Sequence, residues 1–515
     1  MNGRASKQLI WLFILIVNAF PGRVASAQVA AAPSACAGAG ECLCDNSYQD
    51  CRTPLLNLIA RETQGIAVSM WFMTDYRFRD ALVKRKNAGV DVRVIVDTQA
   101  DATYPANKTE REMMIKAGIP VRDCISPKGI NHWKAMIFKG LGKVQFSAAN
   151  FANGSFSPFG SPTTIPYVTY VDEAIYFTDD DSIVRTFMRR FDDHWTNTTE
   201  FRSLGSFSLN RMFEGSSQFA LNPDLNFVPY QYYEDRLRTQ VALEDRQKNP
   251  NAAIDAVMFR ITSAKIPDAL IARRQAGVPV RLITDARQYR NTTYFWDSYN
   301  VDRMYMAGIA IKWKDKSLTD QDMHQKSIIL YTRGSAAGAP MVVFGSSNWT
   351  SASNSGQREH NYFTRKAWII DWFIDQFDRK WNNLKASGSA IGQTVFDAFV
   401  PGDPETPKIS APANGAVGTP TSVTLKWEGG WWAHKYDVFL SESPAVNSSG
   451  VMTAPKILVD FMPGAATAGV KSSKEAVAVS NLKPGTTYYW QIRGKTMANR
   501  TKIGPVWRFT TAGAP

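Results

Sequence analysis

Apolar and polar positions along most of this chain follow two different spacings. Apolar runs rich in β-branched residues, such as 66–72 and 90–96, are separated by a stretch with helical spacing that ends at Gly89. Amphipathic helices are predicted over 181–195 and 369–381. Strands that alternate with helices favour a largely parallel sheet covered on both faces, so the pattern predicts an α/β fold of the α/β/α sandwich type.

This pattern occurs twice. The segment 80–97 reappears as 268–285, about 190 residues later. That distance is far longer than the roughly 20–50 residues of a solenoid repeat, so the repeated unit is a domain. We expect two halves, 53–205 and 206–400, related by a pseudo-two-fold axis as in a dimer fused into one chain, and we expect the protein to be a monomer.

The composition changes after residue 400. A proline-rich linker, 401–407, precedes short alternating apolar runs in residues 408–515. The sequence Leu-Lys-Pro-Gly-Thr-Thr-Tyr at 482–488, the expected buried tryptophan and the strand spacing resemble a fibronectin type III domain. The last domain is therefore predicted to be an all-β sandwich.

The N-terminus has the features of a secretory signal peptide. Arg4 and Lys7 precede an apolar run, 9–20, and an Ala-Ser-Ala sequence at 25–27 is typical of a cleavage site. The run is too short to span a bilayer, although a membrane anchor is the alternative interpretation. We expect residues 1–27 to be removed and the protein to be secreted or periplasmic.

Four of the five cysteines crowd the segment 28–52 that follows the signal. In an oxidising compartment they are expected to form disulfides whose pairing stays open, with Cys124 either free or joined to this cluster. The spacing lacks the paired Cys-x-x-Cys units of zinc sites, so no metal is predicted and zinc is the weaker alternative. The four residues are Cys36, Cys42, Cys44 and Cys51.

Positive charge is concentrated near the C-terminus. The chain has 59 basic and 46 acidic residues and a net charge of +13, and residues 405–515 hold 12 basic residues against 6 acidic ones. A basic domain suggests contact with an anionic surface such as lipid headgroups, a cell-wall polymer or nucleic acid. An equally good interpretation is that the excess charge only keeps the protein soluble.

Each half contains the sequence His-x-Lys at the start of an apolar run, and a second apolar run that ends in an asparagine. Residues i and i+2 of a strand point to the same side, so an imidazole and an ammonium share a face, which suits a phosphate. These residues are His132, Lys134 and Asn150 in the first half, and His324, Lys326 and Asn348 in the second.

A histidine that acts as a nucleophile or an acid needs its second ring nitrogen held by a carboxylate. Glu173 and Glu359 are the candidates, because each follows the asparagine of its half and stands three residues before a Tyr-Phe pair. Each motif alone is more often structural than catalytic. The complete set, in register within a duplicated fold, predicts a phosphodiesterase site.

The other three histidines and two strand-end aspartates are not part of such a repeated set of motif residues. His194, on a closing helix, and His434, in the β-domain, are interpreted as structural, whereas His360 could line the cleft. Asp97 and Asp285, at matching strand ends, are also interpreted as structural rather than as ligands.

The duplicated pattern resembles the phospholipase D superfamily over almost all of residues 53–395. The family motif is HxKxxxxD followed by GSxN, and Gly345 and Ser346 complete its second part in the second half. The resemblance implies that one histidine attacks phosphorus to form a phosphohistidine while the other protonates the leaving alcohol and then activates water. It also implies that lysines and asparagines hold the phosphate oxygens, that no metal or cofactor is needed, and that His132 is the nucleophile.

The chain departs from the family pattern at two places. Lys139 and Tyr331 replace the motif aspartate, which is mainly structural in the family, and the first half has Ser-Ala-Ala at 147–149 where GSx is expected. These changes weaken the inference that the protein is an active enzyme. If either of the two motifs is degenerate, they indicate the one in the first half.

Export, two halves in one chain and aromatic residues near the motifs favour a phospholipid substrate, whose distal phosphodiester bond would be cleaved to phosphatidic acid and an alcohol. The insert 151–166 could form a lid. The alternatives are a secreted endonuclease, whose aromatic residues would stack on bases, and a surface-binding protein with a degenerate site. The aromatic residues concerned are Trp71, Phe72, Trp133, Phe151, Phe156, Phe159 and Trp349.

Overall fold

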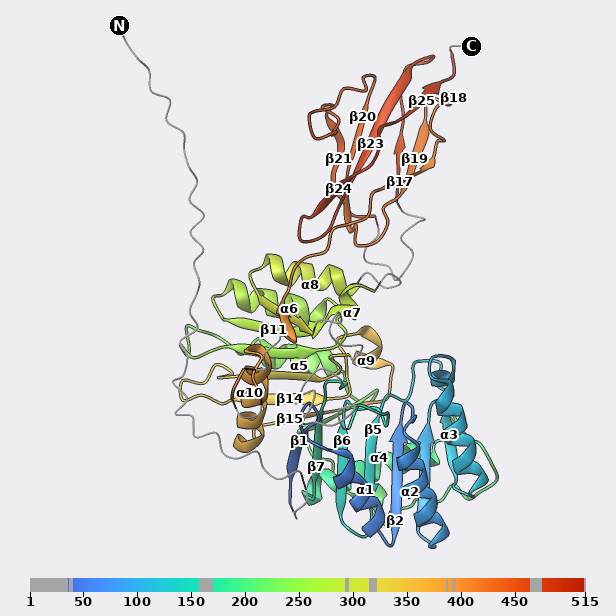
Figure 1. The fold of residues 1–515 in the computed structure, drawn as a ribbon, viewed down its shortest axis with the longest axis vertical. Coiled ribbons are helices and arrows are strands. Elements are labelled where there is room, and N and C mark those ends of the chain that lie inside the picture. The colour runs from blue at the N-terminus through green and yellow to red at the C-terminus, as the bar shows by residue number, and fades with distance from the viewer. Residues whose placement is uncertain are drawn as a thin grey trace.

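A computed structural model describes residues 36, 40–156, 170–291, 296–314, 322–385, 388–390, 394–463 and 475–513. Two eight-stranded sheets with their helices form the main body, and a separate β-domain stands at one end (Figure 1). The predicted signal peptide, 1–27, and most of the insert 151–166 lie outside the described residues. Within the described part of the chain, no helix combines the length and apolar character that a membrane crossing requires.

The first sheet has the strand order β1-β7-β6-β5-β2-β3-β4-β8. Its strands are β1 (Cys42–Asp45), β2 (Gly65–Met70), β3 (Asp91–Val96), β4 (Val121–Cys124), β5 (Lys134–Phe138), β6 (Lys143–Ser147), β7 (Ala174–Thr178) and β8 (Phe201–Ser203). Its helices are α1 (Arg52–Arg61), α2 (Tyr76–Asn87), α3 (Pro105–Lys116) and α4 (Asp181–Thr196), with 3-10 turns η1 (Thr98–Ala102) and η2 (Ser216–Gln218).

The second sheet repeats this order strand for strand, as β9-β15-β14-β13-β10-β11-β12-β16. The duplication predicted from the sequence is therefore confirmed. Its strands are β9 (Leu225–Val228), β10 (Ile254–Met258), β11 (Val280–Asp285), β12 (Ala310–Lys314), β13 (Lys326–Leu330), β14 (Met341–Gly345), β15 (Glu359–Thr364) and β16 (Phe396–Ala398). Its helices are α5 (Tyr233–Val241), α6 (Lys265–Gln275), α7 (Ala286–Tyr289), α8 (Trp296–Met306), α9 (Ser351–Ser355) and α10 (Ala367–Trp381).

Both sheets are mixed, so the prediction of largely parallel sheets is wrong. In the first sheet β2, β3 and β4 run parallel, while β5, β6 and β7 pair antiparallel; the second sheet repeats this arrangement. The reason is the short connection between β5 and β6, a turn over 139–142 in which Gly142 has a φ of +57°. A turn of this length joins antiparallel strands, whereas parallel strands need a crossover of about a dozen residues or more.

Local sequence signals explain where the helices begin and end. The Asp75 carboxylate accepts a hydrogen bond from the Arg77 amide at the start of α2, and Gly89, with a φ of +86°, follows its end. Asp180 caps α4 in the same way, accepting from the amides of Ser182 and Ile183. The predicted helices 181–195 and 369–381 correspond to α4 and α10.

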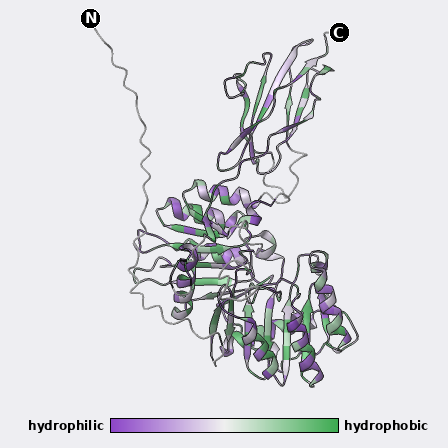
Figure 2. Cartoon of the chain, in the orientation of Figure 1, coloured by the Kyte–Doolittle hydropathy of each residue, from purple (hydrophilic) through white to green (hydrophobic). Residues whose placement is uncertain are grey.

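One apolar core joins the two halves. The ring of Phe146 on β6 stacks on that of Phe344 on β14, with centroids 6.0 Å apart, and on Phe187 of α4 at 4.8 Å. Each half also has its own core on the outer side of its sheet. The strands are mostly apolar and the outer helix faces polar (Figure 2). Each fully buried phenylalanine contributes about 1.5–3 kcal/mol, so the shared core fixes how the halves meet.

The C-terminal β-domain has a three-stranded sheet, β17-β19-β22, and a six-stranded sheet that contains β18, β25, β23, β20, β21 and β24. Trp427, Tyr436 and Trp490 are fully buried between them, and the Tyr488 hydroxyl accepts from the Lys483 amide at 3.0 Å. The fibronectin type III identity stays a prediction. The strands are β17 (Lys408–Ala411), β18 (Ala416–Thr419), β19 (Val423–Glu428), β20 (Lys435–Ser441), β21 (Lys456–Phe461), β22 (Ala476–Val479), β23 (Thr487–Lys495), β24 (Thr501–Ile503) and β25 (Trp507–Thr511).

This β-domain contacts α7 and α8 of the second half (Figure 1). The Ser298 hydroxyl lies 3.1 Å from His434 Nε2, and the Gly402 amide donates to the Tyr289 hydroxyl at 2.8 Å. His434, interpreted from the sequence as structural, lies at this contact between the domains.

The cysteine-rich segment contains two disulfides, Cys36–Cys42 and Cys44–Cys51. Cys124 is free and buried. The strand within this segment, β1, is the edge strand of the first sheet and pairs antiparallel with β7.

Candidate active site

The two His-x-Lys sequences lie at equivalent places, at the starts of β5 and β13. An aspartate at the end of β3 or β11, two strands away in the same sheet, fixes the backbone in front of each. Asp97 accepts from the Asn131 amide at 2.7 Å, and Asp285 accepts from the Met323 amide at 2.9 Å. The structural interpretation of Asp97 and Asp285 agrees with these contacts, because each aspartate also caps the short helix that follows it.

Each histidine is held by a glutamate of the other half. His132 Nδ1 lies 2.9 Å from Glu359 Oε2, and His324 Nδ1 lies 2.5 Å from Glu173 Oε1. A backbone hydrogen bond also joins the two halves here, because the His132 amide donates to the Arg358 carbonyl at 2.9 Å. Neither half therefore completes a histidine–glutamate pair by itself.

The two lysines are buried beside these pairs. Lys134 Nζ donates to the His132 carbonyl at 2.8 Å, and Lys326 Nζ donates to the His324 carbonyl. Burial lowers the pKa of Lys326 to about 8, although the two glutamates oppose this shift. Burial, together with the charge of Lys326, lowers the pKa of Lys134 well below its usual range. Two ammonium groups held in one buried cluster form a site for an anion.

The imidazoles belong to the same electrostatic cluster. Burial and the neighbouring Lys134 lower the pKa of His132 to about 4, against the opposing effect of Glu359. Burial, both lysines and the charge of His132 lower the pKa of His324 well below its usual range. A bound phosphate anion would favour the protonated forms and raise these pKa values.

The two glutamates have different surroundings. Glu359 accepts hydrogen bonds from the hydroxyls of Ser346 at 2.6 Å and Ser353 at 2.7 Å. Burial by itself would raise the pKa of Glu359, but His132 and these polar neighbours lower it below its usual range. Glu173 Oε2 is buried without a hydrogen-bond partner, and burial raises the pKa of Glu173 to about 8.

The side chains of both asparagines are buried. The side-chain oxygens of Asn150 and Asn348 have no hydrogen-bond partner among the described residues. Their residues are 6% and 8% exposed, and His132 and His324 are 4% and 7% exposed, whereas the lysines and glutamates are 0–2% exposed. The site therefore opens to solvent through its imidazoles and amides.

Ser346 of the GSxN motif contacts a glutamate of its own half. Its hydroxyl donates to Glu359 Oε2 at 2.6 Å. Ala148 stands at the corresponding place of the first half, which explains why Glu173 lacks this donor. Ser353 was missed from the sequence because it lies outside the GSxN motif, and only the fold brings it to the glutamate.

Most aromatic residues near the motifs are buried in the core, so they offer no surface to a substrate and do not support the choice of a phospholipid. Trp133, Phe151, Phe156 and Trp349 are 0% exposed, and Phe72 is 5% exposed. Aromatic side chains within a sandwich pack between layers wherever the neighbouring elements cover them. Phe159 lies outside the described residues.

Two aromatic rings remain beside the histidines. Trp71 lies 5.5 Å from His132, and Phe259 lies 4.7 Å from His324, measured between ring centroids. They follow the equivalent strands β2 and β10. Phe259 was missed, although its place after the repeated strand pattern could have revealed it.

The remaining residues singled out in the sequence are buried or lie at the far ends of strands. His360 is fully buried, so the expectation that it lines the cleft is wrong, and its Nε2 accepts from the Lys134 amide at 3.3 Å. His194 packs against Trp133 in the core. At the far ends of the strands, Lys139 donates to the Met212 carbonyl and Tyr331 donates to Asp255.

No cluster of three or more histidine, cysteine, aspartate or glutamate side chains suited to a metal ion occurs within the described ranges. The reactive groups that the structure brings together are two imidazoles, two ammonium groups and two carboxyls. Such a set can bind a phosphate diester, supply a nucleophile and supply an acid.

Comparison with known proteins identifies the duplicated domain. Residues 55–195 and 245–381, more than half of the chain, match the family model described as "Cardiolipin synthase, PLD-like domain". A mitochondrial cardiolipin hydrolase of Chlamydomonas reinhardtii is 30% identical over 132 residues, 26% of this chain and 52% of that protein. The human mitochondrial cardiolipin hydrolase is 26% identical over 136 residues, 26% of this chain and 47% of that protein. The chain thus spans about half the length of the curated relatives it matches.

Solved structures show more distant likenesses. The polyphosphate kinase of Porphyromonas gingivalis has a TM-score of 0.45 at 16% identity, covering 67% of this chain and 48% of that one. A phospholipase D family member, Nuc of Salmonella typhimurium, has a TM-score of 0.24 at 20% identity, covering 31% of this chain and 95% of that one. Because both scores lie below 0.5, the family assignment rests on the domain match alone.

Proposed function

Because this chain belongs to the phospholipase D-like family and carries the domain twice, we propose that it is a phosphodiesterase that hydrolyses the distal phosphodiester bond of phospholipids. The observation that carries the proposal is the pair of crossed histidine–glutamate contacts, His132 with Glu359 and His324 with Glu173. A cluster that contains two oriented imidazoles and two ammonium groups has all the groups needed for a two-step displacement at phosphorus.

The first step forms a phosphohistidine. With its Nδ1 hydrogen donated to Glu359, His132 uses the Nε2 lone pair to attack phosphorus. The P–N bond forms as the bond between phosphorus and the leaving oxygen breaks. His324, protonated in the presence of the bound anion, gives its Nε2 proton to that oxygen, and the alcohol departs.

Water completes the second step. His324, now neutral, accepts a proton from a water molecule, and the resulting hydroxide attacks phosphorus. The P–N bond breaks, the electron pair returns to His132 Nε2, and the phosphomonoester is released. Lys134, Lys326 and the two asparagines hold the non-bridging oxygens throughout, so negative charge on them is stabilised.

Support for a phospholipid comes from the matched relatives, both of which are named cardiolipin hydrolases. Cardiolipin and phosphatidylcholine are both diesters in which phosphorus joins a glycerol oxygen to a second alcohol. The bond cleaved in the proposed reaction is the one to that second alcohol. A nucleic acid offers the same diester group, and the experiment below decides between these substrates.

The test uses the purified full-length protein in EDTA, incubated separately with phosphatidylcholine vesicles, cardiolipin vesicles and plasmid DNA. We expect phosphatidic acid to appear from the lipid vesicles. His132→Ala and His324→Ala should each abolish turnover, because His132 forms the phosphohistidine and His324 transfers the protons. Nicked DNA without lipid cleavage would assign the protein as a nuclease, and no cleavage of any substrate would assign it as a binding protein.

We also propose that the protein is exported, with the signal cleaved after Ala27. Two disulfides in the first described residues support an oxidising compartment. Mass spectrometry of the protein from its native source should then find Gln28 as the first residue. A mature chain that retains residues 1–27 would contradict the cleavage.

A further inference from the structure

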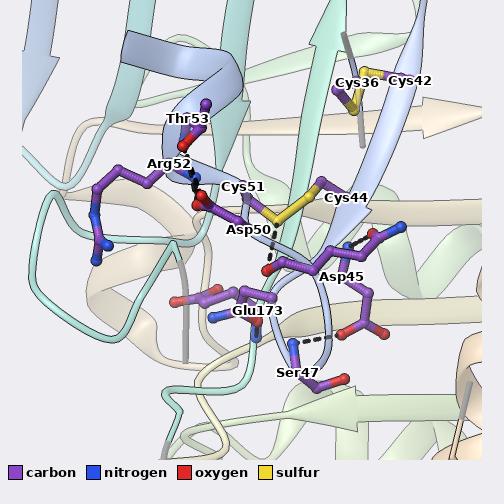
Figure 3. Close-up of a disulfide and its surroundings, with 12 residues drawn as sticks. Cys36, Cys42, Cys44, Asp45, Ser47, Asp50, Cys51, Arg52, Thr53 and Glu173 are labelled. Atoms are coloured by element: carbon purple, nitrogen blue, oxygen red, sulfur yellow. Dashed lines mark hydrogen bonds between the residues drawn. A yellow bond between two sulfur atoms is a disulfide. The ribbon is translucent and has the colours of Figure 1, made fainter. Parts of the chain in front are cut away.

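The cysteine-rich segment comes close to one of the two glutamates. Strand β1 pairs with β7 in a register that places Asp45 opposite Ala174. Asn46, the residue that follows β1, therefore lies opposite Glu173. Glu173 is the glutamate whose carboxyl contacts His324 Nδ1. Figure 3 shows Glu173 beside the loop that the Cys44–Cys51 disulfide closes.

Asn46 is fully buried and uses both ends of its amide. Its Oδ1 accepts from the Glu173 amide at 3.1 Å. Its Nδ2 donates to the carbonyls of Gly154 at 3.2 Å, Ser155 at 2.9 Å and Val171 at 2.5 Å. One side chain thus ties the loop after Asn150 to the segment that leads into Glu173.

At the equivalent place of the second half, an apolar residue takes the position of Asn46. Val228 stands opposite Glu359 in the pairing of β9 with β15, and its side chain has no hydrogen-bonding group. Glu359 is instead fixed through its carboxylate by Ser346 and Ser353. The two halves therefore hold equivalent glutamates by different means, one through the carboxylate and one through the backbone.

Glu173 depends on its backbone more than Glu359 does. Its carboxyl has a hydrogen bond to His324 only at Oε1, and Oε2 is buried without a partner. Ala148 stands where Ser346 stands in the second half, so its side chain donates no hydrogen bond to the Glu173 carboxyl. If the backbone at Glu173 moved, no second hydrogen bond to its carboxyl from a described residue would keep it against the imidazole.

The segment that carries Asn46 is itself anchored. Gln376 Nε2 of α10 donates to Asp45 Oδ2 at 2.8 Å, and Arg379 of the same helix forms an ion pair with Asp45. On the other side, the Cys51 amide donates to the Phe156 carbonyl at 2.7 Å. A residue held in this way can transmit rigidity to the segment it contacts.

We propose that Asn46 is a positioning residue of the active site, which fixes the backbone of Glu173 and thereby the orientation of His324. The effect on turnover rests on the proposed function, whereas the effect on the His324–Glu173 hydrogen bond does not. Asn46 touches no reacting atom, so its contribution passes entirely through Glu173.

The kinetic test is a double-mutant cycle between Asn46→Ala and Glu173→Ala, measured on bis(p-nitrophenyl) phosphate. Asn46→Ala should lower kcat by about 10- to 100-fold, the usual cost of losing a group that orients a reactive side chain. In the Glu173→Ala background the same change should have little further effect, because the group it positions is gone. Independent losses that multiply would overturn the proposal.

Asn226→Ala is the matched control. Asn226 is a buried asparagine on the corresponding edge strand β9, and its Oδ1 accepts from Asn361 at 3.4 Å. This variant also removes a buried amide from an edge strand, and its kcat should stay within about threefold of the wild type. If Asn46→Ala does not fold, Asn46→Ser takes its place, since a hydroxyl is too short to reach both Glu173 and the loop carbonyls.

A second measurement does not depend on turnover. In protein labelled with ¹⁵N-histidine and studied above pH 8, where Glu173 is ionised, the Nδ1 proton of His324, assigned with His324→Ala, should resonate far downfield because it is donated to the Glu173 carboxylate. Asn46→Ala should weaken or abolish that signal, and Asn226→Ala should retain it. An unchanged signal in Asn46→Ala would overturn the positioning role even if the wild type cleaved no diester, an outcome that would reject the proposed function alone.

Discussion

Charge differs between the two glutamates that contact His132 and His324. His132, Ser346 and Ser353 surround Glu359, and its pKa lies below the usual range, so its carboxylate is charged at neutral pH. Burial raises the pKa of Glu173 to about 8, so its carboxyl is mostly protonated there. The site is therefore nearly symmetric in its residues but not in its charge.

This difference predicts unequal effects of removing each charge. At pH 7, Glu359→Gln should lower kcat at least about tenfold more than Glu173→Gln, because only Glu359 loses a charge; tenfold corresponds to about 1.4 kcal/mol. Above pH 8, where Glu173 ionises, the two losses should converge. Steady-state kinetics of both variants between pH 6 and about 9 checks this. Equal losses at pH 7 would contradict the assigned charges.

Lys326 predicts how substrate binding depends on pH. Its pKa of about 8 means that the ammonium is charged below this pH and neutral above it. The KM for bis(p-nitrophenyl) phosphate, which stays a monoanion, should therefore rise as the pH increases through 8. Lys326→Arg should move that rise to higher pH because a guanidinium keeps its charge. A KM that is flat from pH 7 to about 10 would contradict a binding role for Lys326.

At the scale of elements, the edge strand β1 links the disulfides to the site. β1 pairs with β7, the strand that begins just after Glu173. Helix α10 of the second half contacts the same strand through Asp45. The edge strand of the first sheet is therefore a junction between the cysteine-rich segment, the second half and the active site.

Reduction should consequently affect activity before it unfolds the protein. Breaking Cys44–Cys51 frees a loop that holds Asn46, so treatment with a reductant should lower kcat severalfold while the main thermal transition persists. The double variant Cys44→Ser/Cys51→Ser should show the same loss without reductant. Cys124→Ser serves as the control, since that cysteine is already free. Full activity in the reduced protein would show that strand pairing alone holds the loop.

At the scale of the whole molecule, ion pairs divide the described basic side chains of the β-domain into two groups, those paired with a carboxylate and those left unpaired. Several of its lysines and arginines form ion pairs, for example Lys456 with Asp437 and Lys483 with Glu442. Within the described residues of the domain, four basic side chains have no ion pair. They are Lys408, Lys426, Lys502 and Arg508.

These four side chains are the ones expected to contact an anionic surface. Replacing all four with glutamate, or deleting residues 405–515, should weaken binding to vesicles rich in anionic lipid and leave hydrolysis of a soluble diester unchanged. Vesicle co-sedimentation at two salt concentrations measures the first effect, since screening reduces contacts between exposed charges. An equal loss on vesicles and on the soluble diester would assign the domain a role in the stability of the catalytic body.

The sequence by itself determined the features that depend on local pattern. Strands, helix ends at residues such as Gly89, the duplication and the repeated His-x-Lys sequences all follow from neighbouring residues, because the spacing of side chains along an element is fixed by its backbone. The tertiary structure alone decided which groups meet. His132 and Glu359 are 227 residues apart and His324 and Glu173 are 151 apart, and they pair across the halves because the shared core sets how the two sheets face each other. The burial of the aromatic residues, the hydroxyl contact of Ser346 and the placement of Asn46 beside Glu173 depend on the same packing, which no local spacing encodes.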